Sequence, residues 1–311
     1  MTNFIPSLQN ENLQLERLAA QRQLYTSAKN VMQIKFFLTI PILILLSIIT
    51  FLVPTLKIWY AFYGIFLVLI NAAILNPFEI SLKKQAATIQ ELFDCEMFQL
   101  PWPKWKLNEK PDPELIQKEV TNYIKKNHDF SALQDWYPKQ IEKLPHSFAR
   151  LLCQRINLKY DADLRRHYTT RLLILFILVG IIIVSLGIFS GLTIETFILA
   201  MLAPLLPLII WGMDEYSKNI HAADHLENLK RLSEQLWNLS ISSSISREQF
   251  DRESRDLQNE IFDCRKNNPL IFDWIYNRMK DPQQDQMYKS ADFFVSEAIK
   301  SLKEDEVLPH D

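Results

Sequence analysis

Four long apolar runs dominate the pattern of hydrophobic and polar positions along the chain. Each run is eighteen residues long, and three of them contain no charged residue. They cover residues 36–53, 58–75, 172–189 and 194–211. A helix of that length measures about 27 Å, close to the hydrocarbon thickness of a bilayer. The pattern therefore predicts an integral membrane protein with four transmembrane helices.

The short connectors within each pair of runs predict two helical hairpins. Residues 54–57 join the first pair and residues 190–193 join the second, which leaves every long polar segment on one side of the membrane. That side carries the basic residues Arg22, Lys29, Lys35, Lys83, Lys84, Arg165, Arg166, Arg171 and Lys218, and the opposite side carries only Lys57. Because basic residues favour the cytoplasmic side, we expect both termini in the cytoplasm.

Polar and helix-breaking residues inside the runs are candidates for a pore lining or a hinge. Pro41, Pro204 and Pro207 lack a backbone donor, so we expect bends there, which fit either a packing kink or a gating hinge. Asn71 lies deep in the second run and Glu195 lies at the outer end of the fourth. Polar groups at such depth usually face a partner helix or an aqueous path, although solvation at the interface is the simpler account of Glu195.

The remaining segments also predict helices, which gives an all-α fold with a helical cytoplasmic assembly. Residues 8–35 and 146–171 show helical spacing and run into the first and third spans without a breaker. Three prolines after Leu100 predict a loop. The expected regions are an N-terminal cytoplasmic helix (1–35), a first transmembrane hairpin (36–75), a cytoplasmic region (76–171), a second hairpin (172–211) and a C-terminal cytoplasmic region (212–311).

The distribution of charges and the spacing of the cysteines argue against a nucleic-acid-binding protein and against a disulfide-bonded one. Residues 212–311 carry thirteen basic and twenty acidic side chains, a net charge of −7, so this region is not a nucleic-acid-binding arm. We expect no nucleic acid among the partners. The three cysteines, Cys95, Cys153 and Cys264, lack any C-x-x-C spacing. They fit reduced thiols in a cytosolic compartment better than a disulfide framework.

Motifs for catalysis or metal binding are missing from the sequence. It contains no G-x-x-x-x-G-K-[ST], G-x-S-x-G or H-E-x-x-H motif, and its five glycines form no glycine-rich loop. His221 and His225 lie one helical turn apart beside Asp224, but the local sequence offers no third ligand or base. We therefore expect no enzyme activity, no cofactor and no metal site.

Two segments carry a family resemblance, one before the third span and one in the C-terminal region. The matching residues are Trp136, Tyr137, Pro138, Arg150, Cys153, Gln154, Arg155, Asn157, Leu164, Arg165, Arg166 and Tyr168, followed by Ile261, Phe262, Arg265, Pro269, Asp273, Trp274 and Tyr276. With the two-hairpin layout, they resemble the bacterial four-transmembrane effector family that is associated with SMODS nucleotidyltransferases. Phe272 departs from the proline that this family more often has before the D-W pair, which suggests a locally altered turn.

The resemblance implies an effector of nucleotide-signalled antiphage defence in the bacterial inner membrane. A cyclic nucleotide made on infection would trigger it to disrupt the membrane through a pore, and the cell would die or stop growing. Four helices do not enclose a wide pore, so we expect a homo-oligomer in the lipid bilayer. The alternatives are a constitutive channel or transporter, and a membrane scaffold that recruits a cytoplasmic partner.

Cationic and aromatic residues of the two motif segments are candidates for binding a cyclic nucleotide. Arginine binds phosphate, and aromatic rings stack on bases. The candidates are Arg155, Arg165, Arg166, Arg265 and Trp274. Each is also compatible with a salt-bridged or packed role, and the signal can alternatively act through a cyclic-nucleotide-sensing partner.

Overall fold

The described part of the chain is built from helices and contains no strand, which confirms the predicted all-α class. The computed structural model describes residues 3–307 except 190, 192 and 243. Within these residues, the side chains of 51–52, 200–201, 274, 277–285 and 302–307 are not described.

The first part of the chain forms seven of the labelled helices. They are α1 (Ile5–Leu8), α2 (Asn12–Thr39), α3 (Pro41–Leu52), α4 (Lys57–Ile70), α5 (Asn76–Met97), α6 (Lys104–Leu107) and α7 (Pro113–Asn127). A π-helical segment over Asn71–Leu75 joins α4 to α5. Short 3-10 turns lie at Pro54–Leu56, Ser131–Leu133 and Lys139–Lys143.

The second part forms the remaining labelled helices. They are α8 (His146–Phe189), α9 (Ile194–Phe197), α10 (Ala203–Ile241), α11 (Arg247–Asn267) and α12 (Asp273–Val307). A second π-helical segment, Ile198–Leu202, joins α9 to α10. The predicted continuity of the cytoplasmic helix 146–171 with the third span is confirmed, because α8 covers both without a break.

Three stretches of helix are long and apolar enough to cross a membrane. They are Asn12–Thr50, Pro54–Met97 and His146–Phe189. They contain the second and third predicted spans completely and the first apart from residues 51–53. Almost none of each apolar window is buried inside the molecule, so these faces require a non-aqueous surrounding. The fourth predicted span, 194–211, is not among them and stays a prediction.

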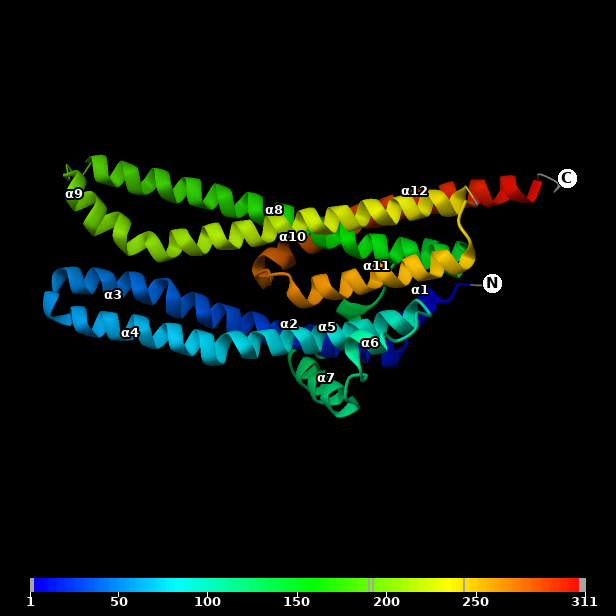
Figure 1. Cartoon of the computed structure of the whole chain (residues 1–311), viewed down its shortest axis with the longest axis horizontal. Coiled ribbons are helices and arrows are strands. Elements are labelled where there is room, and N and C mark those ends of the chain that lie inside the picture. The colour runs from blue at the N-terminus through cyan, green and yellow to red at the C-terminus, as the bar shows by residue number, and fades with distance from the viewer. Residues whose placement is uncertain (1–2, 190, 192, 243, 308–311) are drawn as a thin grey trace.

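The helices form two layers that α11 joins. In the first layer α2 packs against α5 and α7, and in the second α8 packs against α10 and α12. α11 contacts α5 on one side and α8 and α10 on the other. Figure 1 shows α3, α4 and α9 at one end of the molecule and both termini at the opposite end, beyond α11.

The predicted hinge prolines lie at helix starts or inside a helix. Pro41 is the first residue of α3, and Pro204 lies in the first turn of α10, two residues after the π-helical segment that ends at Leu202. Pro207 lies within α10. A proline cannot donate to the preceding turn, and a local π-helical adjustment is a common way to accommodate one in a membrane helix. Their role as hinges stays a prediction.

Asn71 and Glu195 occupy different environments. Asn71 begins the π-helical segment after α4, and its Oδ1 is buried without a hydrogen-bond partner among the described residues. Glu195 is exposed in the first turn of α9, where a negative charge is favourable. The structure therefore agrees with solvation as the simpler account of Glu195.

Two glycines let α8 approach the helices that follow it. A Cβ atom at Gly212 of α10 would lie 1.9 Å from Cζ of Phe176 in α8, and one at Gly187 of α8 would lie 2.5 Å from the ring of Phe197 in α9. Each phenylalanine ring therefore occupies the space that a side chain would fill. Small residues that let helices approach closely are typical of membrane helix packing.

We predict that Gly212→Ala destabilises the purified protein, because the new methyl group forces Phe176 out of its site. Overpacking of this kind costs about 1–3 kcal/mol. Thermal unfolding in detergent measures the effect. Gly180→Ala is the matched control, since nothing lies within 4 Å of a Cβ atom there. Equal midpoints for the two variants would contradict this account of the packing.

Candidate ligand-binding site

A cavity of about 470 Å³ opens between the two helical layers. Its walls come from α2, α5, α8 and α11, from the segment before α8 and from residues 268–276. Nine of the family-motif residues line it: Trp136, Tyr137, Asn157, Leu164, Arg165, Ile261, Arg265, Pro269 and Tyr276. Its volume lies within the range of about 300–1,000 Å³ that is usual for small-ligand sites.

The lining of the cavity carries an excess of positive charge. Four cationic side chains line it, Arg22, Lys29, Arg165 and Arg265, against the two carboxylates of Asp94 and Asp161. The lining therefore has a formal net charge of +2. A cleft of this sign favours an anionic ligand.

Arg265 forms a buried ion pair with Asp94 that joins α11 to α5. The Asp94 side chain is 1% exposed and that of Arg265 is 13% exposed, so neither charge is solvated freely. Burial works against the charge of Arg265, but the adjacent Asp94 carboxylate raises the pKa of the guanidinium above its ordinary value. The pair forms one wall of the cavity and also fixes the contact between the layers.

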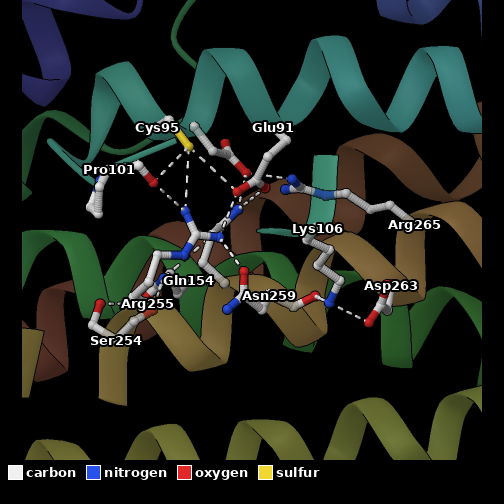
Figure 2. A network of polar contacts seen from close by, with 12 residues as sticks. Glu91, Cys95, Pro101, Lys106, Gln154, Ser254, Arg255, Asn259, Asp263 and Arg265 are labelled. Atoms are coloured by element: carbon white, nitrogen blue, oxygen red, sulfur yellow. Dashed lines mark hydrogen bonds and ion pairs between the residues drawn. The ribbon is translucent and has the colours of Figure 1, made fainter. Parts of the chain in front are cut away.

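A network of polar side chains continues from this ion pair into the core between α5, α8 and α11 (Figure 2). Gln258 donates to Asp94 at 2.7 Å and to Glu91 at 2.9 Å, and Arg255 pairs with Glu91 at 2.6 Å. Gln154 of α8 donates to Gln258 Oε1 at 3.1 Å. The motif residue Gln154 thus connects α8 to the charges of α5 through α11.

Burial changes the pKa of one carboxyl group in this network, that of Glu91. The side chain of Glu91 is wholly buried, and this burial raises the pKa of the Glu91 carboxyl, although Arg255 opposes the shift. Buried charges that are paired and hydrogen-bonded are stable only while every partner is present. Loss of any one charge of this network should therefore weaken the contact between the two helical layers.

Arg165 connects the cavity to α10, the helix that contains the end of the predicted fourth span. Its Nη1 donates to Asn219 Oδ1 of α10 at 2.7 Å and to the Pro269 carbonyl at 3.0 Å. Its Nε lies 3.1 Å from Asp161 Oδ1, an ion-pair contact. Two of its three partners are therefore neutral oxygens.

A second buried group extends these contacts toward the membrane. Asn219 donates to Glu215 Oε1 at 2.9 Å, and Tyr168 of α8 donates to the same oxygen at 3.1 Å. Burial raises the pKa of Glu215 above its ordinary value. The motif residues Arg165 and Tyr168 thus tie α8 to α10 just outside the apolar segments.

Arg22 and Lys29 of α2 face Tyr276 across the cavity. The Arg22 Cζ lies 4.5 Å from the centre of the Tyr276 ring, and the Lys29 Nζ lies 5.3 Å from it. Lys29 also pairs with Asp273 at 2.6 Å. Burial disfavours the charge of Arg22, but Tyr276 and the Asp273 carboxylate outweigh this effect and raise the pKa of the guanidinium above its ordinary value.

Sequence reasoning did not identify Arg22 and Lys29 as part of a site. It treated them only as basic residues near a span end. Their spacing with Tyr25, at 22, 25 and 29, places all three on one helical face. A charged and aromatic face on a helix that leads into a membrane span was the signal that could have found them.

Aromatic rings cover another part of the cavity wall. Trp136 and Tyr160 pack edge to face with centroids 5.0 Å apart, and Tyr160 lies 6.5 Å from Tyr276. The Trp136 Nε1 donates to Asn157 Oδ1 at 3.2 Å, and Asn157 donates to the Tyr137 hydroxyl at 2.9 Å. Pro138 then begins the turn that leads to α8. Aromatic rings beside cations suit a flat aromatic group that carries an anion.

The structure separates the five predicted ligand residues. Arg165 and Arg265 line the cavity. Arg155 lies outside it, paired with Glu234 at 2.6 Å, and Arg166 lies on the surface, 3.0 Å from Asp224. The side chain of Trp274 lies outside the described side chains.

Other motif residues have packing partners elsewhere. Arg150 pairs with Asp251 and contacts the Phe98 carbonyl. Phe272, the departure from the family pattern, packs edge to face on Phe36 at 5.9 Å and on Trp211 at 6.4 Å. The turn before α12 therefore contacts both layers where the apolar segments begin.

His221 and His225 are both exposed on α10. His225 lies 3.8 Å from Glu260. Within the described residues, no three His, Cys, Asp or Glu side chains are placed to hold a metal ion.

We predict that Asp94→Asn destabilises the protein strongly, because it leaves the Arg265 charge buried without a counterion. Removal of one partner of a buried ion pair costs about 3–5 kcal/mol. The matched control is Asp224→Asn, whose exposed pair with Arg166 is worth about 0–1 kcal/mol. Chemical unfolding in detergent measures both, and similar losses in the two variants would refute the role given to Asp94.

We predict that Glu215→Gln changes the pH dependence of stability. Because burial raises the folded-state pKa of Glu215, its contribution is complete below the unfolded value near 4.5 and is lost as the pH rises through the folded-state pKa. The glutamine variant keeps the side-chain oxygen that accepts from Tyr168 and Asn219. Because glutamine does not ionise, the variant does not lose this stability as the pH rises. Its melting midpoint should therefore rise relative to wild type as the pH increases above about 4.5 and passes the folded-state pKa of Glu215. A difference between the two midpoints that does not change with pH would contradict this prediction.

Comparison with known proteins assigns the chain to a family. Residues 3–294 match the SMODS-associating 4TM effector domain, in agreement with the resemblance of the two motif segments. A protein of Bacillus cereus, described as a probable CBASS effector molecule, is 26% identical over 290 residues, which span 89% of this chain and 94% of that protein. No solved structure gives a significant match. The chain belongs to the SMODS-associating 4TM effector family.

Proposed function

We propose that the chain is a membrane effector of antiviral defence, which a cyclic-nucleotide signal triggers to permeabilise the bacterial inner membrane. The family and the similarity to a probable CBASS effector support a defence role in cyclic-nucleotide signalling. The three apolar helices support a membrane location. Loss of the membrane barrier kills or arrests the infected cell.

One observation carries this proposal: helices that line the charged cavity continue into the apolar segments. α8 contributes Arg165 to the cavity and runs on through residues 172–189 without a break. α2 contributes Arg22 and Lys29 and leads into α3 with a break only at Ile40. Rigid helices can carry a change at one site to another. A ligand that shifts the cavity walls thereby shifts the membrane segments.

The proposed topology has four spans in two hairpins, with both termini in the cytoplasm. α3 contacts α4, and α10 lies along α8, where Gly212 and Phe176 interlock. The fourth span then runs from α9 through the π-helical segment into α10. Lys35, Arg171 and Lys218 follow the apolar segments on the proposed cytoplasmic side, in accordance with the positive-inside rule.

The proposed mechanism is rearrangement and self-association of the spans, without a catalytic step. Four helices cannot enclose a wide pore, so several copies are required to form one. Exposed apolar side chains such as Ile58, Ile181 and Ile188 provide surfaces for lipid or for a second copy. A true pore and less ordered disruption both follow from such an arrangement.

A constitutive channel is the second candidate function. Two observations favour it: the π-helical segments at Asn71–Leu75 and Ile198–Leu202 each precede a proline by two residues, and Asn71 has a buried unpartnered oxygen. Broken helices at matching positions are common in transport proteins. This candidate predicts ion leakage without any signal.

We predict that expression of the full chain together with an active cognate nucleotidyltransferase collapses the membrane potential. A voltage-sensitive dye in living cells measures it. The control is the same chain with a catalytically inactive nucleotidyltransferase, in which the potential should persist. Normal potential in both cultures would refute membrane permeabilisation and favour a scaffold, and collapse in both would favour the constitutive channel.

A further inference from the structure

We propose that the cavity binds a cyclic dinucleotide directly, with Arg22 as a principal phosphate-binding residue and the rings of Trp136, Tyr160 and Tyr276 beside the bases. This inference rests on the proposed function, since it identifies the receptor site for the signal. It concerns the chain itself and requires no separate sensing partner.

Arg22 is the candidate phosphate-binding residue because the other three cations of the cavity are paired with carboxylates. Arg265 is neutralised by Asp94, Lys29 by Asp273 and Arg165 by Asp161. Arg22 is half-buried and forms no ion pair of its own among the described residues: the centre of the Tyr276 ring lies 4.5 Å from its Cζ, and Asp273, which pairs with Lys29, acts on it from farther away. A partly desolvated guanidinium that lacks a direct ion pair can form charge-assisted hydrogen bonds with a phosphate oxygen.

Arg165 provides the second anchoring position. Its Nη1 donates to two neutral oxygens, Asn219 Oδ1 and the Pro269 carbonyl. A phosphate is a stronger acceptor than either of these oxygens. A ligand phosphate therefore competes for this group, and the competition acts on α10 and on the turn before α12.

The charge of the lining matches the ligand class. The four cations of the lining face Asp94, Asp161 and the Asp273 that pairs with Lys29, so this group of charges is net positive by one. A cyclic dinucleotide carries one negative charge on each of its two phosphodiesters, and this sign favours its binding. The volume of about 470 Å³ suits a small molecule. Aromatic walls then accommodate bases by stacking.

Two further side chains offer hydrogen bonds to the ligand. Gln21 Oε1 and Asn268 Nδ2 belong to residues that line the cavity, and both atoms are buried without a hydrogen-bond partner among the described residues. Buried polar atoms of this kind are uncommon and call for an explanation. An acceptor and a donor fit the edge of a base or a ribose hydroxyl.

The test measures binding by the purified full chain in detergent, with a panel of cyclic dinucleotides of different bases and linkages. At least one should bind saturably, and Arg22→Gln should weaken that binding by at least about tenfold, as the loss of a charge-assisted hydrogen bond predicts. Arg22→Lys should retain part of it. The matched control is Arg166→Gln, also an arginine change but outside the cavity, which should bind like wild type. Inorganic phosphate and adenosine, tested separately, should bind far more weakly.

Three outcomes overturn the inference: no saturable binding by the panel, equal weakening in Arg22→Gln and Arg166→Gln, or unchanged binding in Arg22→Gln. Thermal unfolding of each variant establishes that it is folded. The measurement also separates the two proposals. If no cyclic dinucleotide binds while signalled cells lose their membrane potential, the membrane function stands and direct binding is wrong. If a cyclic dinucleotide binds while signalled cells keep their membrane potential, direct binding stands and the proposed membrane function is wrong.

Discussion

The charged contact between α5 and α11 is the constraint on which the rest of the structure depends. Asp94 and Glu91 lie almost fully buried on α5, and Arg265 and Arg255 of α11 compensate them. Taking such charges from water is expensive unless each has a well-placed partner. The two helical layers are therefore held in one register, and that register leaves the cavity between them, with the Asp94–Arg265 pair in its wall.

Long helices connect this cavity to the membrane. Arg165 on α8 contacts α10 through Asn219, and the turn that supplies the Pro269 carbonyl also places Phe272 against Phe36 and Trp211. The same short turn therefore contacts the cavity, the start of the first apolar segment and the end of the predicted fourth one. Our proposal uses this shared position: a ligand that competes for Arg165 acts directly on the contact between the membrane segments.

Much of the architecture could be predicted from the sequence, because apolar runs and helical periodicity are local signals. The all-α class, three of the four proposed spans and the continuity of α8 follow from them. The candidate site depends on contacts between distant segments, which periodicity does not encode. Arg165 and Arg265 meet in one cavity, whereas Arg155 and Arg166 turn toward Glu234 and Asp224, although all four are motif arginines. Arg22 was overlooked because its role appears only when the turn before α12 brings Tyr276 across from α2.

The central claim is that one polypeptide both senses a nucleotide and opens the membrane. Ion flux from proteoliposomes that contain only the purified full chain tests it most directly, because no other protein is present. The account predicts little flux without nucleotide and rapid, saturable ion release when a cyclic dinucleotide is added on the side that carries the termini. Flux that is the same with and without every cyclic dinucleotide would contradict it.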